Sequence, residues 1–137
     1  MRVTTEFSIR MENRPGSLAK VCEALAQHGV NIIAFQSIPS QRSVLLCIVT
    51  DNPLAAQSAL DGAGIIYAEA EVVQEKLANH PGELARVAKQ LGEANVNINY
   101  AYFGVEPDSN APLVILGITD VGRAIGAIER TARAATS

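Results

Sequence analysis

Four asparagines form two equivalent pairs along the chain: Asn13 with Asn31, and Asn79 with Asn97. An amide side chain offers both hydrogen-bond donors and acceptors, so two of them can satisfy the ammonium and the carboxylate of a small zwitterion. A helix beginning near Pro15 or Pro81 would leave unpaired N–H groups beside the first asparagine of each pair, which favours a carboxylate there. Gly16 and Gly82 let a ligand approach the backbone closely. These residues predict two polar loops that can bind a zwitterion.

Structural roles remain open for the same asparagines. The first of each pair could bond the local backbone before a helix, and the second could pair with backbone where a helix turns into a strand. His80 lies in the second loop and is a further candidate contact to a ligand. Asp51 and Asp120 are expected to cap the helices that follow them, since no carboxylate cluster accompanies them. Tyr100 and Tyr102 share one face of a strand and are expected to pack in the core.

The sequence shows no catalytic or metal-binding pattern. There is no nucleophile beside a histidine and a carboxylate, no phosphate-binding loop of the Walker type and no zinc-ligand spacing. We therefore expect no catalytic residue, no metal site, no cofactor and no enzymatic activity. An enzyme on the same scaffold is the third hypothesis, because a fold alone never excludes one.

Composition limits the class of protein. The chain has 137 residues, of which 48% are apolar and 18% charged, which suits a globular fold. Its net charge of -3 provides no excess of cations for a phosphate backbone, so we expect no nucleic-acid partner. Apolar runs such as 44–49 are far shorter than the ~20 residues of a membrane span, so we expect no membrane partner. Cys22 and Cys47 lie in apolar runs and are interpreted as buried thiols in a reducing compartment, which indicates a cytoplasmic protein.

An internal duplication organises the chain. A shift of 66 residues aligns 13–32 with 79–98, and ten of those twenty positions are identical, whereas chance gives about one or two. After a three-residue insertion, 44–51 aligns with 113–120. We therefore expect two domains, one over 1–69 and one over 70–137.

Hydrophobic periodicity predicts the same order of elements in each copy. In the first copy these are a strand over 7–11, a helix from Pro15, strands over 30–38 and 43–50, a helix over 53–60 and a short strand over 65–67. Gly29 and Asn95 are expected to end the first helix of each copy in a left-handed conformation. The second copy has the corresponding elements through a helix over 121–134 and lacks its last strand. Arg2 to Thr5 could fill the place of that strand beside Val72 to Leu77. The expected buried helix positions are Leu18, Val21, Leu25, Leu84, Val87 and Leu91.

This order predicts an α+β fold: two ferredoxin-like βαββαβ sandwiches in tandem, each an antiparallel sheet with two helices on one face. The loop 12–18 followed by Val30, Asn31 and Ile32 resembles the ACT domain, a small regulatory fold of amino-acid metabolism, and 79–84 with 96–98 repeats it. The whole chain is similar to stand-alone tandem ACT proteins. In serine-sensing members a histidine precedes the loop asparagine by two residues, and Met11 and Leu77 stand there instead, which argues against serine.

The resemblance implies an amino-acid-binding regulatory protein without catalytic activity, whose ligand lies where the first loop meets the start of the second strand, usually at an interface between ACT domains. The candidate ligand-binding residues are Asn13, Pro15, Gly16, Asn31, Asn79, His80, Gly82 and Asn97. The alternative is a structural or regulatory assembly subunit of an amino-acid metabolic enzyme that binds no small molecule. The expected partners are an amino acid or analogue, a second chain in a homodimer, and an enzyme of amino-acid metabolism. The homodimer is expected because bare strand edges generally pair with another strand.

Overall fold

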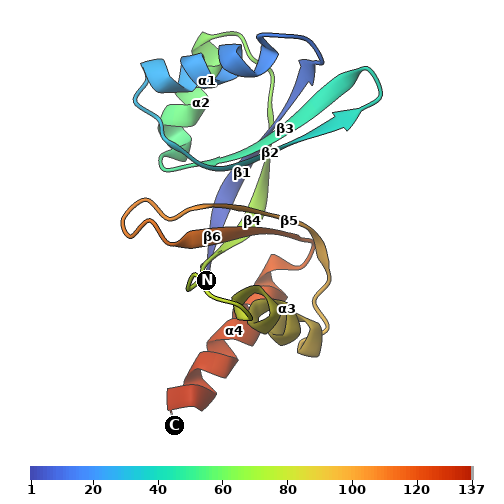
Figure 1. Cartoon of the computed structure of the whole chain (residues 1–137), viewed down its shortest axis with the longest axis vertical. Coiled ribbons are helices and arrows are strands. Elements are labelled where there is room, and N and C mark those ends of the chain that lie inside the picture. The colour runs from blue at the N-terminus through green and yellow to red at the C-terminus, as the bar shows by residue number, and fades with distance from the viewer. Residues whose placement is uncertain (137) are drawn as a thin grey trace. The chain divides into compact units, whose positions relative to one another are not determined.

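The computed structural model describes the backbone over residues 1–136 and the side chains over 1–130, so the predicted end of the second domain, Ser137, lies outside the described residues. The elements follow in the order β1 (Arg2–Glu12), α1 (Ser17–Gln27), β2 (Ile32–Ser40), β3 (Ser43–Thr50), α2 (Pro53–Gly62), β4 (Ala68–Lys76), α3 (Glu83–Glu93), β5 (Ile98–Val105), β6 (Pro112–Ile118) and α4 (Val121–Thr136) (Figure 1). The six strands and four helices of the described residues make an α+β fold, as predicted.

Contacts divide the chain into two compact units, one of Thr5–Ala70 and one that joins Met1–Thr4 to the residues from Glu71 onward. The strands β1 and β4 each begin in one unit and end in the other. The prediction of two independent sandwiches, one after the other, is therefore wrong in this respect. A strand that continues past the last contact of its own sheet can serve both copies. The predicted short strand over 65–67 is also wrong, because these residues are not in a strand. The strand β4 begins at Ala68 and covers the predicted link 68–70 together with most of the predicted strand 71–77.

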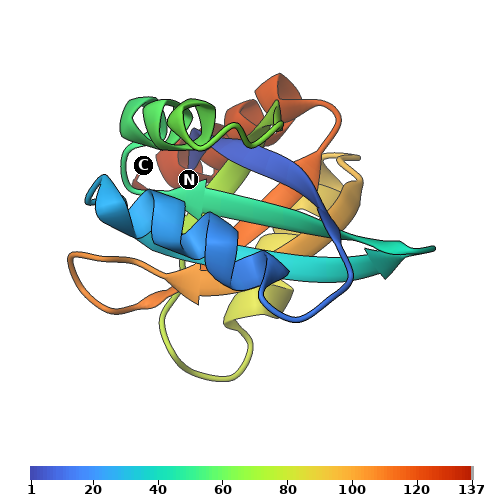
Figure 2. The same cartoon turned by 90° about the horizontal axis from the view of Figure 1, so that it is seen from above.

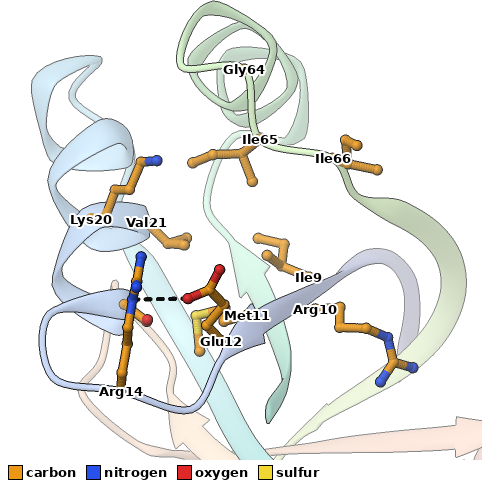
Figure 3. Close-up of a pocket in the computed structure, with 11 residues that line it drawn as sticks. Ile9, Arg10, Met11, Glu12, Arg14, Lys20, Val21, Gly64, Ile65 and Ile66 are labelled. Carbon is orange, nitrogen blue, oxygen red and sulfur yellow. Dashed lines mark ion pairs between the residues drawn. The ribbon is translucent and has the colours of Figure 1, made fainter. Parts of the chain in front are cut away.

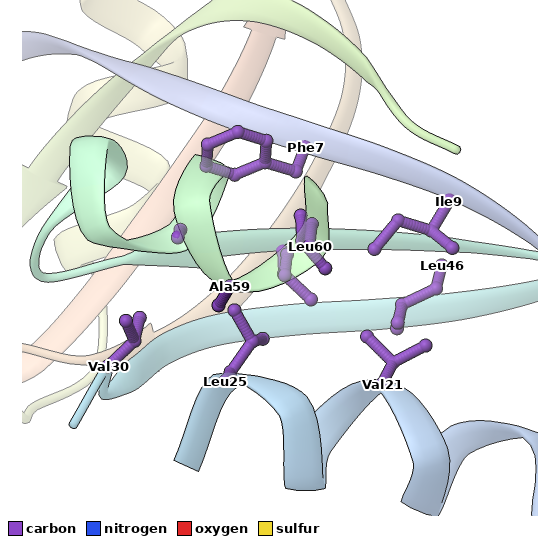
Figure 4. Packing of buried hydrophobic residues seen from close by; sticks show 10 residues of the cluster. Phe7, Ile9, Val21, Leu25, Val30, Leu46, Ala59 and Leu60 are labelled. Carbon is purple, nitrogen blue, oxygen red and sulfur yellow. The ribbon is translucent and has the colours of Figure 1, made fainter. Parts of the chain in front are cut away.

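The unit Thr5–Ala70 is an antiparallel sheet in the order β1, β3, β2, with α1 and α2 on one face (Figures 2 and 4). Alternate residues of the strands point to the helices, and Ile9 lies opposite Leu46 in the register. The core is aliphatic apart from one ring, and its buried members are Phe7, Ile9, Val21, Leu25, Val30, Leu46, Ile48, Ala56, Ala59 and Leu60. Figure 4 shows Val21 of α1 directed toward Leu46 of the sheet and Leu25 of α1 directed toward Ala59.

The other unit repeats this arrangement with β4, β6 and β5 in antiparallel order, and with α3 and α4. The first residues of the chain lie beside its edge strand: the Met1 amine is 3.2 Å from Glu75 Oε2, and Arg2 Nε and Nη2 donate to the side-chain oxygen of buried Gln74 at 2.6 and 2.9 Å when that amide faces them. These contacts lie where the sequence suggested that Arg2 to Thr5 could replace the missing last strand.

Both predicted helix ends are confirmed, because Gly29 and Asn95 have φ values of 67° and 58°. The predicted helix starts are wrong by two residues. Gly16 and Gly82, with φ values of 89° and 92°, cap α1 and α3, which begin only after them. A left-handed residue cannot continue a right-handed helix, so Pro15 and Pro81 stay in the loops.

Four of the six predicted core positions on α1 and α3 are buried: Val21, Leu25, Val87 and Leu91. Leu18 and Leu84 are 38% and 42% exposed, so their predicted burial is wrong. Both belong to the first helical turn, one turn before the residues that reach the sheet. Cys47 is buried as expected, whereas Cys22 is only half-buried; both thiols are free, and burial raises their pKa values.

The caps of α2 and α4 correct the alignment of the two copies. Asn52 Oδ1 accepts from the backbone N–H of Ala55 at 3.1 Å, and Asp120 Oδ1 accepts from that of Arg123 at 2.9 Å. Asn52 and Asp120 are therefore equivalent, and the copies differ here by 68 residues, not 69. Asp120 caps a helix as predicted, but Asp51 does not: its Oδ1 accepts from the backbone N–H of Asn31 at 2.9 Å.

Candidate functional site

The predicted ligand-binding residues of the first copy lie at two places. Asn13, Pro15 and Gly16 form the exposed loop between β1 and α1. Asn31 is exposed just before β2, and its backbone N–H and carbonyl bond the side chain and the backbone N–H of Asp51 at 2.9 and 3.0 Å. The local backbone role that was open for Asn31 is thus filled by its main chain, and its amide side chain faces solvent.

These two places are at opposite ends of the strands of one sheet. Glu12, which precedes Asn13, pairs with Ser43, whereas Ile32, which follows Asn31, pairs with Thr50. Ser43 and Thr50 are the two ends of β3, about 23 Å apart at roughly 3.3 Å per residue. The two asparagines of one copy therefore do not meet. A site that contains both an Asn13-type and an Asn31-type side chain must combine two copies of the fold.

The second copy has the same separation, with more of its polar atoms already bonded. The ring Nδ1 of His80 donates to the carbonyl of Pro81 at 3.0 Å. Asn97 Nδ2 donates to Asn99 Oδ1 at 3.0 Å, and Asn99 Nδ2 donates to Thr119 Oγ1 at 2.9 Å. A ligand that contacted Asn97 would compete with this chain of amides.

A pocket of about 300 Å³ lies behind the first loop, between the end of β1, the start of α1 and the residues after α2 (Figure 3). It is lined by Ile9, Arg10, Met11, Glu12, Arg14, Ser17, Lys20, Val21, Gly64, Ile65 and Ile66. Ile9 and Val21 belong to the core, and Met11 and Ile65 pack against it, so the apolar wall of the pocket is fixed by the same packing that stabilises the unit.

Charges of both signs line this pocket. Glu12 Oε2 and Arg14 Nε form an ion pair at 2.9 Å, drawn as a dashed line in Figure 3. Arg10 donates to the Ser43 hydroxyl at 2.9 Å, and its guanidinium points away from the labelled isoleucines in Figure 3. Lys20 forms no ion pair with any side chain of residues 1–130. The pocket thus offers the Lys20 ammonium, the Glu12 carboxylate beside Arg14 and an aliphatic wall.

The corresponding loop of the second copy contains its own carboxylate. Glu83 stands where the first copy has Ser17; its Oε1 accepts from the backbone N–H of Ala78 at 3.0 Å, and its Oε2 lies 3.0 Å from Arg86 Nε. The hydrogen bonds from Arg86 and from that backbone N–H lower the pKa of Glu83 to about 2. Glu83 is therefore a fixed anion inside this loop.

Sequence reasoning found the loop but missed the pocket walls. Lys20 and Val21 follow Ser17 by three and four residues, so they share its helix face, and that spacing could have pointed to them. No local signal could have found Ile65 and Ile66, because tertiary packing alone brings them to β1. The described part of the chain contains no cluster of residues suited to a metal ion, and none of its helices is long and apolar enough to cross a membrane.

Comparisons with known proteins agree with this architecture. Residues 5–59 match the ACT domain family. Protein BT0572 from Bacteroides thetaiotaomicron is 26% identical with a TM-score of 0.84, over 95% of this chain and 89% of that one. The ligand-free regulatory subunit of aspartate kinase from Thermus thermophilus is 20% identical with a TM-score of 0.62, over 93% and 91%, and that from Thermus flavus is 19% identical with a TM-score of 0.55 over the same shares. No curated protein matches the sequence significantly.

Proposed function

We propose that this chain, of which residues 5–59 match the ACT domain family, is an amino-acid sensor with no catalytic activity of its own. The observation that carries the proposal is the pocket behind the β1–α1 loop, which combines the Lys20 ammonium, the Glu12 carboxylate and an aliphatic wall. A zwitterion needs both signs of charge close together, and few other small metabolites do. At about 300 Å³ the pocket is at the small end of ligand sites, as an amino acid requires.

The loop residues Asn13, Pro15 and Gly16 would close over this ligand, and an Asn31-type amide from another copy of the fold would complete the site. Asn79, His80, Gly82 and Asn97 are the equivalent candidates in the second copy. The separation of Asn13 from Asn31 within one sheet supports a site that is completed by an asparagine of a second molecule, as a homodimer would provide. Exposed apolar side chains on β2 are available for such association, since Phe35 and Ile38 are 53% and 45% exposed.

The near full-length likeness to regulatory subunits of aspartate kinase supports a regulatory role. An enzyme of amino-acid metabolism is the partner that this likeness suggests. In this scheme the ligand changes how the protein associates. The second candidate is an assembly subunit that binds no small molecule, since the likeness is to regulatory subunits of an enzyme.

A thermal-shift screen of the twenty amino acids separates the two candidates. A ligand at a hundred times its Kd adds about 2.7 kcal/mol to the free energy of unfolding, which raises Tm by several degrees. We expect the Tm to rise with at least one amino acid. Light scattering at micromolar concentration should give a mass of twice 14.5 kDa. No shift with any amino acid would reject the sensor in favour of the assembly subunit, and a 14.5 kDa particle would reject the homodimer.

A further inference from the structure

The loop between the first strand and the first helix differs between the two copies in whether a side chain of the chain itself fills it. In the second copy the Glu83 carboxylate takes up the backbone N–H of Ala78 and the guanidinium of Arg86. In the first copy the equivalent residue is Ser17, whose side chain is too short to reach either group. The second loop is therefore filled from within, and the first is not.

The groups that hold Glu83 have counterparts in the first copy. The shift of 66 residues places Glu12 at the position of Ala78 and Lys20 at the position of Arg86. The backbone follows the same path in both loops, since Arg14 N–H bonds Glu12 O and His80 N–H bonds Ala78 O, each at 3.0 Å. A ligand carboxylate placed like that of Glu83 would accept from the Glu12 N–H and pair with Lys20, which forms no ion pair with a side chain of residues 1–130.

The two copies also differ in backbone at the segment that forms the wall of the first pocket. In the first copy α2 ends at Gly62, and the chain turns back through 64–66 along the pocket. In the second copy the equivalent helix α4 runs on to Thr136, so the residues that correspond to 64–66 are still helical. At these positions the second copy therefore has a helix where the first has a non-helical segment, and Glu83 occupies the space inside its loop.

The wall indicates the class of side chain that the first pocket accepts. Ile9, Val21 and Ile65 face the space between Lys20 and Glu12 (Figure 3). Ile66, at the margin, is 90% exposed. An aliphatic side chain would remove the surface of Ile9, Val21 and Ile65 from water, whereas a charged group placed against these three side chains would lie on hydrocarbon and lose its hydration.

The geometry points to one aliphatic amino acid bound per chain, in the first copy only, with its carboxylate against Lys20 in the place that Glu83 takes in the second copy and its ammonium against Glu12. This inference rests on the proposed sensor function and adds the ligand class and the occupied copy.

Isothermal titration calorimetry of the full chain with L-valine, L-leucine and L-isoleucine tests it, with L-aspartate and L-lysine as charged comparisons. We expect one aliphatic ligand per chain and at least tenfold weaker binding of the charged ones. Lys20→Ala should weaken binding about tenfold to a hundredfold, as expected for loss of a charged hydrogen bond. Arg86→Ala, the same truncation at the equivalent position, should change the Kd less than twofold.

A second pair of variants tests the internal carboxylate. Ser17→Glu should fill the first pocket as Glu83 fills the second loop and weaken binding at least a hundredfold, whereas Ser58→Glu, which adds the same charge to an exposed position of α2, should not. Circular dichroism checks that each variant is folded. Two ligands per chain, equal losses in Lys20→Ala and Arg86→Ala, or full affinity in Ser17→Glu would overturn the inference. Preference for a charged amino acid would overturn the ligand class and leave the sensor intact, while no binding of any amino acid would reject the sensor as well.

Discussion

The ring of Tyr100 covers the backbone of Gly117 on the neighbouring strand so closely that a Cβ at position 117 would overlap its Cε1 and Cζ atoms. The equivalent pair in the first copy is Ala34 with Val49. The larger side chain of the pair is therefore on β3 in the first copy and on β5 in the second. Tyr100 also stacks on Tyr102, with ring centroids 6.4 Å apart and an interplanar angle of 4°.

Gly117→Ala should therefore lower the free energy of unfolding by about 1 to 3 kcal/mol, because the tyrosine ring must leave its position. Urea denaturation measures the loss. Gly92→Ala is the matched control, since a Cβ there meets nothing within 4 Å and alanine favours a helix by up to about 1 kcal/mol. Equal stability of Gly117→Ala and the parent protein would show that the ring is free to move.

Leu25→Ala and Leu91→Ala should each cost about 2 to 5 kcal/mol, because both side chains are fully buried between a helix and its sheet. The exposed leucines of the same helices provide controls, and Leu18→Ala and Leu84→Ala should change stability by about 0.5 kcal/mol or less. Thermal and urea unfolding of the four variants would contradict this packing if all of them lost the same amount.

Asn52→Ala and Asp120→Ala should each cost about 0.5 to 2 kcal/mol, because each removes the side-chain acceptor of a helix N-terminus. Asn52→Asp keeps an acceptor in place and should retain most of the stability. Denaturant midpoints distinguish the three variants. A loss in Asn52→Asp as large as in Asn52→Ala would mean that the cap is not the cause.

The stability of the second unit should depend on pH through Glu83. Its pKa in the folded protein, about 2, is below the ordinary value of 4.5, so ionisation of Glu83 favours the folded state above pH 4.5. This contribution should disappear as the pH falls from about 4.5 to about 2. Chemical denaturation at a series of pH values checks it, and Glu83→Gln should flatten the profile within that window. An identical profile in Glu83→Gln would assign the acid sensitivity to other carboxylates.

Asn31→Ala and Asn97→Ala should both leave the fold intact, and the one that removes the asparagine completing the single occupied site should weaken amino-acid binding. Both side chains are exposed and outside the apolar core, so their loss costs little packing, whereas an unpaired group on the ligand costs one to a few kcal/mol. Calorimetry gives the Kd, and circular dichroism gives the fold. The amide sites would have to be abandoned if both variants kept the parent affinity.

Local sequence patterns were sufficient for the features that depend on a few neighbouring residues. The duplication, the α+β class and the helix ends at Gly29 and Asn95 were predicted, because apolar periodicity and a left-handed position leave their own marks in the chain. Val21 and Leu25 were placed in the core for the same reason. The residues shared by the two loops also predicted where a ligand would approach.

Tertiary structure alone decided which of these residues meet. It placed Asn13 and Asn31 at opposite ends of the strands of one sheet, brought Ile65 and Ile66 to the pocket behind the first loop, and joined the first residues of the chain to the second copy. Local propensity carries no information on such distances, since strand order and register are set by the packing of residues far apart in sequence. The sequence by itself therefore determined the two loops and their elements, whereas the walls of the pocket exist only because a complete core holds them there.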